Sequence, residues 1–147
     1  MDINHEKEYL AQHQHLKMGV IGSRTFENYP LLEMWIKRCM TKYKVDFIVS
    51  GGRRPDGKGA DTLAENYADQ NKIDKIIFPA DWDLHGKIAG PLRNEKIAKY
   101  SDFILSFWDE VSGGTQDCMD KAFAQNKVSF IINFGGRASI YEPVNYP

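Results

Sequence analysis

The chain has 147 residues, 42% of them hydrophobic and 27% charged, and its formal net charge at pH 7 is −1. This composition is typical of one soluble globular domain with a single core, and the near-neutral charge excludes bulk attraction to nucleic acid or to an anionic membrane. No apolar run approaches the roughly 18 residues of a membrane-spanning helix, and the first residues lack the basic and apolar regions of a signal peptide, so we expect a cytoplasmic protein.

The first half of the chain alternates between short apolar segments and longer amphipathic ones. Residues 1–16 are polar, with a weak helical stripe, and are predicted to form an amino-terminal arm or helix. Strands are predicted at Met18–Ile21 and Asp46–Val49, separated by a helix at Pro30–Tyr43 whose apolar residues recur at helical spacing. Another helix is predicted from Thr62, where Thr-Leu-Ala-Glu matches a capping box, to about Asn71.

The second half of the chain continues this alternation. Strands are predicted at Lys75–Phe78, Asp102–Trp108 and Val128–Ile132. One helix is predicted from Pro91, a residue suited to a first helical turn, to about Tyr100, and another begins at Thr115, its predicted N-cap. Residues 135–147 are predicted to form a carboxy-terminal tail.

Strands that alternate with helices predict right-handed crossovers and a parallel sheet covered on both faces. We therefore expect a single three-layer, Rossmann-like α/β domain at residues 17–134, with a mostly parallel sheet of about five strands. In such sheets ligands bind at the carboxyl ends of the strands, near the switch in strand order.

Three glycine-containing junctions follow predicted strands: Gly22-Ser23-Arg24, Ser50-Gly51-Gly52 and Ser112-Gly113-Gly114-Thr115. Glycines there let backbone N–H groups face outward, and a following helix N-terminus adds partial positive charge, so each junction favours an anion. The guanidinium of Arg24 can bind a phosphate bidentately, although a surface arginine in a plain turn explains it equally well. Together the junctions predict one pocket for a phosphate-bearing small molecule. Neither a GxGxxG fingerprint nor a P-loop is present, which disfavours ordinary dinucleotide dehydrogenases and P-loop NTPases.

Other polar residues lie near the same strand ends. In Gly59-Ala60-Asp61, the aspartate is either a helix cap or a group that orders the glycine loop and a ligand hydroxyl. In Asp81-Trp82, the indole either stacks on a base or packs at the sheet edge. Arg93-Asn94 suits a ribose phosphate, or Arg93 pairs with a neighbouring glutamate on the surface. The basic turn at residues 53–58 is predicted to be exposed, with cations that could lie over a bound phosphate.

No metal and no cofactor are expected. His5, His13 and His15 lie in the polar amino-terminal segment, which lacks the rest of a coordination set. Cys39 and Cys118 both fall in predicted helices, which indicates core thiols rather than a disulfide framework. No Ser/His/Asp arrangement stands out by its spacing.

Taken together, the motifs resemble the YspA-type branch of the SLOG superfamily, which is common in bacteria and their phages. The resemblance covers about Met18 to Ile132 and rests on the glycine junctions and on the motifs Gly59-Ala60-Asp61, Pro79-Ala80-Asp81-Trp82, Ala89-Gly90-Pro91 with Arg93-Asn94, and Phe107-Trp108-Asp109. The superfamily includes the Lonely-guy phosphoribohydrolases, the DNA-processing protein DprA and TIR-linked sensor domains. The resemblance implies a Rossmann-like fold that binds nucleotides or nucleotide-derived ligands, in the host cytoplasm if a phage encodes the protein.

The phosphate is expected at the Gly51-Gly52 and Gly113-Gly114-Thr115 junctions, with Arg24 and Arg93 neutralising its charge and Asp61 or Asn94 holding ribose hydroxyls. The expected ligand-binding residues are Gly22, Ser23, Arg24, Ser50, Gly51, Gly52, Gly59, Asp61, Asp81, Trp82, Arg93, Asn94, Ser112, Gly113, Gly114 and Thr115.

The resemblance leaves open whether the protein is an enzyme. Lonely-guy enzymes use an arginine, matched here by Arg93, and a glutamate, whose position here holds Cys118. A buried thiol cannot replace a carboxylate that stabilises oxocarbenium-like charge. We therefore expect a binding module, acting as a sensor or by sequestering its ligand. The alternative is a nucleotide hydrolase of phosphoribohydrolase or N-glycosidase type, with Asp81 or Asp117 as its carboxylate and Arg93 as a further catalytic candidate.

A third alternative is DprA-like binding of single-stranded DNA. The near-neutral charge and the absence of a basic stripe with stacked aromatic residues weigh against it, so we do not expect nucleic acid as a partner. The sequence leaves open whether the chain forms a homo-oligomer.

Overall fold

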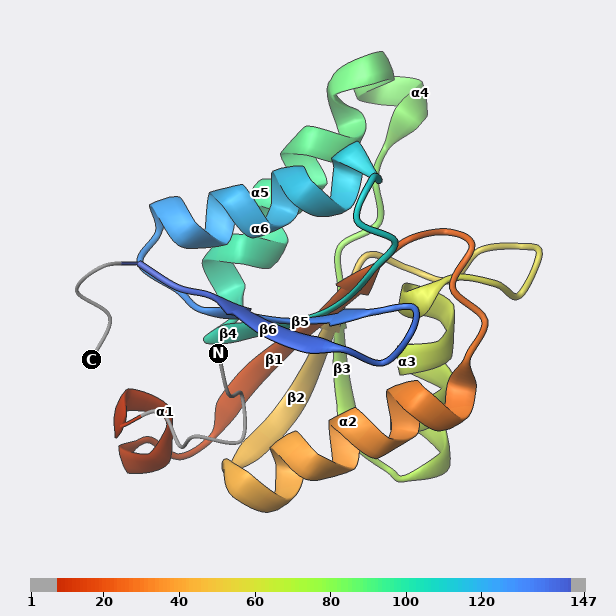
Figure 1. Ribbon diagram of the computed structural model, residues 1–147. Helices are drawn as coiled ribbons and strands as arrows, with labels where there is room; N and C mark the ends of the chain where they lie inside the picture. Colours follow the sequence, from red (N-terminus) through yellow and green to blue (C-terminus); the bar gives the residue numbers. More distant parts are fainter. Residues whose placement is uncertain (1–7, 144–147) are drawn as a thin grey trace.

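The computed structural model describes residues 8–143 as an α/β domain built on one six-stranded sheet (Figure 1). The strands are β1 Leu16–Gly22, β2 Val45–Ser50, β3 Asp74–Ile77, β4 Phe103–Trp108, β5 Ser129–Asn133 and β6 Ala138–Tyr141. They lie in the order β3-β2-β1-β4-β5-β6, with β1 to β5 parallel and β6 antiparallel to β5. The α/β class and the mostly parallel sheet are confirmed, whereas the expected number of strands is one too low.

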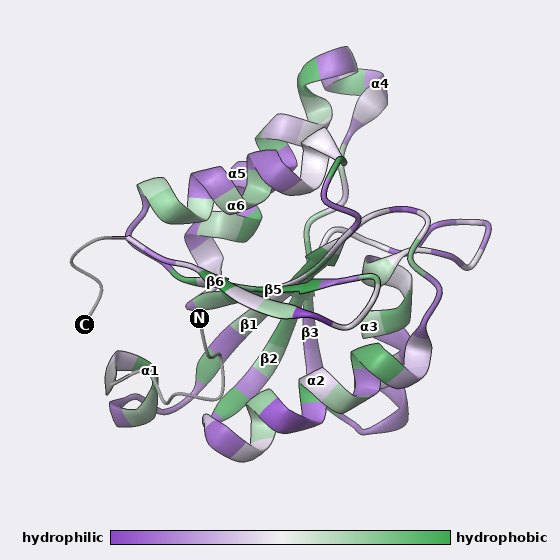
Figure 2. Cartoon of the chain, in the orientation of Figure 1, coloured by the Kyte–Doolittle hydropathy of each residue, from purple (hydrophilic) through white to green (hydrophobic). Residues whose placement is uncertain are grey.

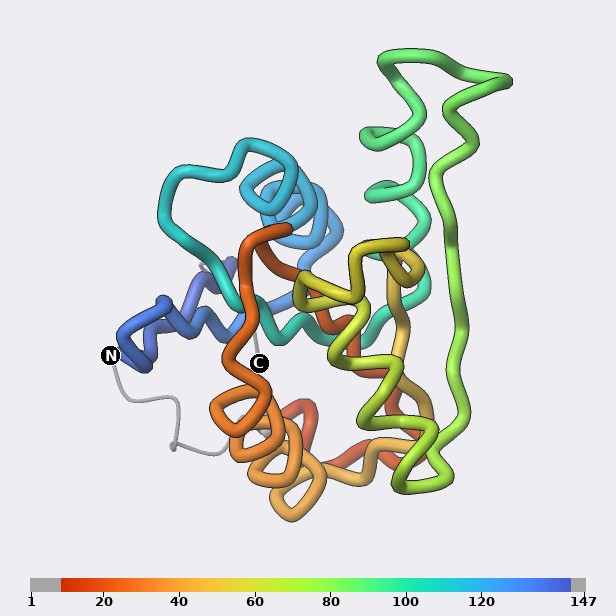
Figure 3. The backbone as a smooth tube through the Cα atoms, turned by 90° about the vertical axis from the view of Figure 1, so that its right-hand side faces the viewer, coloured from red at the N-terminus to blue at the C-terminus, as the bar shows by residue number. Residues whose placement is uncertain are grey.

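The helices of the described chain are α1 Glu8–Gln12, α2 Tyr29–Lys42, α3 Ala60–Gln70, α4 Trp82–His85, the 3₁₀-helix η1 Gly86–Ile88, α5 Ala89–Tyr100 and α6 Gly113–Ala124. Four of them cover the two faces of the sheet. α2 and α3 lie on one face, and α5 and α6 lie on the other (Figure 1). α4 and η1 project beyond the rest of the domain from the start of α5 (Figure 3).

The sheet divides the hydrophobic core into two parts because successive side chains of a strand point to opposite faces. Val20 and Leu105 are buried toward α2 and α3, whereas their chain neighbours Ile21 and Ile104 are buried toward α5 and α6. With both faces covered, the central strands consist mainly of apolar residues (Figure 2). Burying one such side chain contributes roughly 1.5–3 kcal/mol.

The sixth strand lies in the segment that was expected to be a tail. The chain turns at Gly136, where φ is 87°, and the Gly136 N–H donates to Asn133 O at 2.9 Å. β6 then pairs along β5, and Tyr141 stacks on Phe123 with ring centroids 4.8 Å apart. The strand is short, half-buried and at the sheet edge, so its sequence carries only a weak strand pattern.

Two predicted helix starts are wrong. α3 begins at Ala60 with Gly59 at the N-cap, and the capping box at Thr62 does not form, because Thr62 Oγ1 accepts a hydrogen bond from the Arg54 N–H at 2.9 Å. α6 begins at Gly113, so Thr115 is a buried residue inside the helix rather than its cap. The loop expected after β3 contains α4 and η1.

Within residues 8–143, no helix is long and apolar enough to cross a membrane.

Candidate functional site

A cleft lies where the strand order switches. β2 and β4 flank β1 on opposite sides, so the loops that follow these three strands diverge at their carboxyl ends, the usual ligand position in such sheets. The cleft has a volume of about 920 Å³. The expected ligand-binding residues that line it are Gly22, Ser23, Arg24, Gly51, Gly52, Asp61, Trp82, Arg93, Asn94, Ser112, Gly113, Gly114 and Thr115. All three glycine junctions therefore contribute to one cleft.

The loop from β4 into α6 leaves the first turn of that helix open. Ser112 occupies the N-cap but its side chain makes no capping hydrogen bond. Instead, its Oγ lies 2.8 Å from Asp109 Oδ2 and 3.0 Å from Ser23 Oγ. The first N–H groups of an α-helix have no acceptor within it, and a Cβ added at Gly113 or Gly114 would meet no atom within 4 Å. Open amides and the helix dipole make this end of the cleft favourable for an anion.

Asp109 holds this loop in place. Its Oδ1 accepts hydrogen bonds from the N–H groups of Val111 at 2.9 Å and Ser112 at 2.7 Å, and its own N–H donates to Ser23 Oγ at 3.0 Å. Desolvation raises the pKa of Asp109, but these hydrogen bonds outweigh it and leave the pKa below its usual value. Asp109 lines the cleft but is absent from the expected ligand-binding residues. Its position directly after a predicted strand, the same feature that selected the glycine junctions, could have identified it.

Arg93 and Asn94 connect three walls of the cleft. Arg93 Nη1 donates to Gly51 O at 3.0 Å, and its Nε donates to Asn94 Oδ1 at 3.1 Å. The buried Asn94 Nδ2 donates to Gly114 O at 3.1 Å and to Asp117 Oδ2 at 3.0 Å. Both amide donors of Asn94 are therefore used within the protein, and this side chain braces α5 against the start of α6.

Asp117 and Cys118 complete the wall formed by α6. Asp117 Oδ2 also accepts a hydrogen bond from Lys121 Nζ at 2.7 Å. Cys118 is buried, and burial, with a smaller effect from the Asp61 carboxylate, raises the pKa of its thiol to about 12. The thiol is therefore neutral near pH 7, and the Asp117 carboxylate is held by internal partners.

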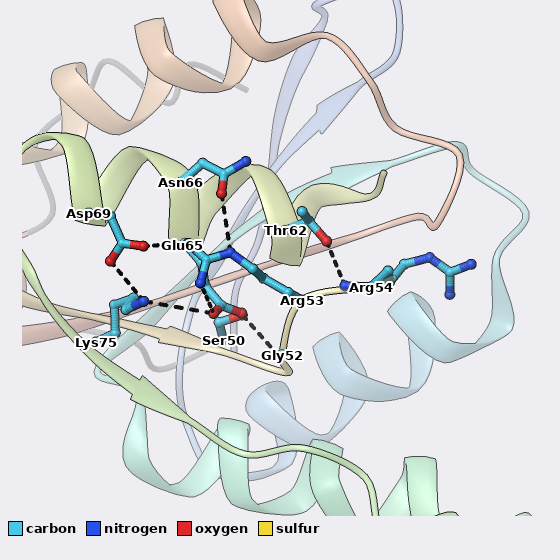
Figure 4. A network of polar contacts seen from close by, with 9 residues as sticks. All are labelled: Ser50, Gly52, Arg53, Arg54, Thr62, Glu65, Asn66, Asp69 and Lys75. Carbon is cyan, nitrogen blue, oxygen red and sulfur yellow. Dashed lines mark hydrogen bonds and ion pairs between the residues drawn. The ribbon is translucent and has the colours of Figure 1, made fainter. Parts of the chain in front are cut away.

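The loop after β2 is fixed by a buried carboxylate (Figure 4). Glu65 in α3 is only 2% exposed, and its Oε2 accepts a hydrogen bond from Ser50 Oγ at 3.0 Å. Ser50 Oγ in turn accepts from the Gly52 N–H at 3.2 Å. Arg53 and Lys75 supply positive charge, with nitrogens 3.5 and 4.0 Å from Glu65 Oε1. A buried carboxylate is costly without such partners, so the network determines the path of the loop.

Gly22 is required by a close backbone contact beside the cleft. A Cβ at Gly22 would lie 2.3 Å from the Phe107 carbonyl oxygen, so the β1 and β4 ends approach more closely than any other residue allows. A Cβ at Gly51 would lie 2.3 Å from Arg93 Nη1, so a larger residue there would displace the Arg93 guanidinium.

Asp61 lines the cleft from the first turn of α3. It is not the helix cap, since Gly59 holds that position without a side-chain hydrogen bond. The carboxylate accepts a hydrogen bond from the Gly51 N–H, and its buried Oδ1 has no hydrogen-bond partner among residues 8–143. Burial raises the pKa of Asp61 to about 6, although the charge of Arg93 and the Gly51 N–H oppose the shift.

Three residues expected at the ligand site do not line the cleft. Ser50 lies beneath the loop and bonds to Glu65. Gly59 is the N-cap of α3, where φ is 94°. Asp81 is the N-cap of α4, and its Oδ1 accepts a hydrogen bond from the Leu84 N–H at 3.1 Å. Its neighbour Trp82 does line the cleft, with its exposed ring beside Gly90.

Arginines supply the positive charge of the cleft. Arg24 is exposed, and no ion pair or side-chain hydrogen bond joins it to another described residue. Arg53 and Arg54 of the basic turn also line the cleft. The Arg54 guanidinium bonds to Asp56 Oδ2 at 2.9 Å, whereas Arg53 pairs with Asp69 and Glu65.

In the part of the chain that the structure describes, no group of three or more His, Cys, Asp or Glu side chains is placed to hold a metal ion. His13 Nδ1 lies 2.6 Å from Tyr9 O, and His15 pairs with Asp46. His5 lies outside the described residues.

Comparisons with known proteins identify the family of the chain. The model of the YspA, cpYpsA-related SLOG family matches residues 19–85, a span that holds the first two glycine junctions and Asp61. The Gene 61 protein of Mycobacterium phage D29 is 36% identical over 96 residues, which cover 61% of this chain and 72% of that protein. The chain belongs to the YspA, cpYpsA-related SLOG family.

Proposed function

We propose that the cleft binds a nucleotide or a nucleotide-derived small molecule through its phosphate, so that the protein acts as a sensor or sequesters this ligand. The observation that carries the proposal is the open first turn of α6. Ser112 is drawn toward Asp109 and Ser23, so its hydroxyl does not cap the helix, and the surface at Gly113 and Gly114 is unobstructed. Backbone amides at such a position bind phosphate without any charged side chain.

The charges around the cleft support the same ligand. Arg24 and Arg93 line it with guanidinium groups, which bind phosphate oxygens in a planar, bidentate geometry. The volume of about 920 Å³ exceeds what phosphate alone would fill and lies within the range for small-molecule ligands. Membership in the SLOG family supports a nucleotide-related function, whereas the name of the phage relative indicates no ligand.

Hydrolysis of a nucleotide has less support. Of its two candidate carboxylates, Asp81 lies outside the cleft and caps α4, while Asp117 is bonded to Asn94 and Lys121. A neutral thiol at Cys118 supplies no replacement. Single-stranded DNA has less support as well, because among residues 8–143 Trp82 is the one aromatic residue that lines the cleft, and such binders use several stacking platforms.

The test is calorimetric titration of AMP into the wild-type protein and the Gly114→Val variant. A Cβ at Gly114 lies in open space, so the valine should not disturb the fold, and its branched side chain adds bulk to the first turn of α6, where the phosphate is proposed to bind. We expect affinity to fall at least ~10-fold, equivalent to about 1.4 kcal/mol, with an unchanged far-UV circular dichroism spectrum. Ala124→Val, at the exposed far end of α6, is the matched control. Equal AMP affinity in the Gly114→Val variant would place the anion site elsewhere.

A further inference from the structure

The two glycine junctions that were expected to share the phosphate differ in whether their amides are free. In the junction after β2, the Gly51 N–H donates to the Asp61 carboxylate, and the Gly52 N–H donates to Ser50 Oγ at 3.2 Å (Figure 4). Both amides are therefore occupied, and the charge of Asp61 opposes an anion there. The first turn of α6 keeps open amides, so of the two junctions it is the one suited to phosphate.

Asp61 gives the β2 side of the cleft an acceptor instead. It lines the cleft, and its Oδ2 would lie 3.0 Å from a Cβ added at Gly51, so the carboxylate sits beside the residue directly after β2. The buried Oδ1 has no hydrogen-bond partner among residues 8–143, which is costly for a carboxylate. With a pKa of about 6 the group is ionised at about pH 7.5, and an ionised carboxylate only accepts hydrogen bonds. What the empty site lacks is therefore a donor, which a ligand hydroxyl can supply.

Asn94, the other residue expected to hold ribose hydroxyls, is occupied. Its Nδ2 donates to Gly114 O at 3.1 Å, and its Oδ1 accepts from Arg93 Nε at 3.1 Å. Arg93 Nη1 in turn donates to Gly51 O at 3.0 Å. These two side chains are enough to connect the β2 loop with the first turn of α6, so one small ligand can reach both sides of the cleft.

We propose that Asp61 accepts hydrogen bonds from the sugar hydroxyls of the ligand, so that the cleft selects ribonucleotides over 2′-deoxyribonucleotides. This selectivity rests on the proposed function, because the phosphate must lie at the first turn of α6 for the sugar to lie near Asp61. The sugar joins the phosphate to the base, so its hydroxyls lie nearer to a bound phosphate than the amino groups of the base. Dinucleotide-binding sheets share the strand order β3-β2-β1-β4-β5-β6, and in them an acidic side chain binds the ribose 2′-hydroxyl.

The first test compares the affinities of the wild-type protein for AMP and for 2′-deoxy-AMP by calorimetry at about pH 7.5, where Asp61 is ionised. We expect AMP to bind ~10–100-fold more tightly, the range for one hydrogen bond to a charged group. Equal affinities for the two nucleotides would overturn the selectivity and leave the proposed phosphate site standing. Binding of neither nucleotide would overturn the proposed function and the selectivity with it.

The second test assigns the selectivity to Asp61. Asp61→Ala removes the acceptor, so its affinities for AMP and 2′-deoxy-AMP should agree within ~3-fold. The loss should fall on AMP alone, because 2′-deoxy-AMP loses no hydrogen bond and a negative charge near its phosphate is removed. Asp61→Asn keeps the shape of the side chain and should show an intermediate ratio, whereas Asp74→Ala, at the exposed start of β3, is the matched control with the wild-type ratio. Equal weakening of both nucleotides in Asp61→Ala would show that Asp61 only positions the Gly51 loop, which would contradict the proposal.

Discussion

At the scale of single residues, Arg93 is both a structural group and a candidate phosphate ligand. Its guanidinium bonds to Gly51 O and Asn94 Oδ1, so it fixes two walls of the cleft while it supplies charge to the cleft itself. A substitution at this position therefore affects the ligand-free protein as well as binding.

We expect Arg93→Ala to reduce AMP affinity by ~10–100-fold and to destabilise the ligand-free protein by about 1–2 kcal/mol, because two charge-assisted hydrogen bonds are lost. Arg93→Lys keeps the charge but loses the planar guanidinium, so its affinity for AMP should lie between those of the wild type and Arg93→Ala. Calorimetry measures the affinity and urea unfolding measures the stability. Reduced stability with unchanged affinity in both variants would identify Arg93 as a loop-positioning residue only.

Asp61 should make stability depend on pH. Its folded-state pKa of about 6 lies above the unfolded value of about 3.9, so the folded state binds more protons between these values. The stability it contributes is fully present below about pH 4 and is lost as pH rises through 6. We expect Asp61→Asn to become more stable than the wild type as pH increases from 4 to 7.5, by roughly 1–3 kcal/mol.

Thermal unfolding at a series of pH values measures this difference. The exposed Asp74→Asn on β3 is the control for loss of one negative charge. A stability difference between Asp61→Asn and the wild type that stays constant over the pH range would show that Asp61 is not a desolvated carboxyl group.

At the scale of elements, the β4–α6 loop determines whether the helix amides are open. Asp109→Ala removes the acceptors for two backbone N–H groups and for the Ser112 hydroxyl. We expect a loss of about 1–3 kcal/mol in stability and weaker AMP binding, because Ser112 is then free to cap α6. Ser139→Ala, on the exposed part of β6, is a control for loss of a surface polar group. If Asp109→Ala binds AMP as tightly as the wild type, the geometry of this loop does not determine anion binding.

Local sequence patterns predicted most of the strands and helices but not all of their boundaries. Every parallel strand and every helix of eight or more residues was predicted near its observed position, because each carries a continuous apolar run or a helical stripe. The starts of α3 and α6 were misplaced because Thr62 and Thr115 have the residue type of a cap but different partners or positions in the fold. β6 was missed because only its pairing with β5 defines it.

At the scale of the whole molecule, the arrangement of the cleft argues against cleavage of an N-glycosidic bond. We expect the wild-type protein to release no free adenine from AMP above a heat-inactivated control, because Cys118 is neutral and Asp117 is held by Asn94 and Lys121. Chromatographic detection of adenine over several hours measures this. Steady release that scales with protein concentration would show that another carboxyl group, such as Asp61, acts in catalysis.

The sequence by itself determined the α/β alternation and the positions of the three glycine junctions, because both depend on residues that are close together in the chain. The sequence also predicts that these junctions share one pocket, but the strand order that sets the loops after β2, β1 and β4 around one cleft appears only in the tertiary structure. So do the burial of Asp61, the internal bonding of Asn94 and Asp117, and the position of Asp81 outside the cleft. The reason is physical: periodicity is local, whereas desolvation and the choice of hydrogen-bond partner depend on residues that the fold brings together from distant parts of the chain.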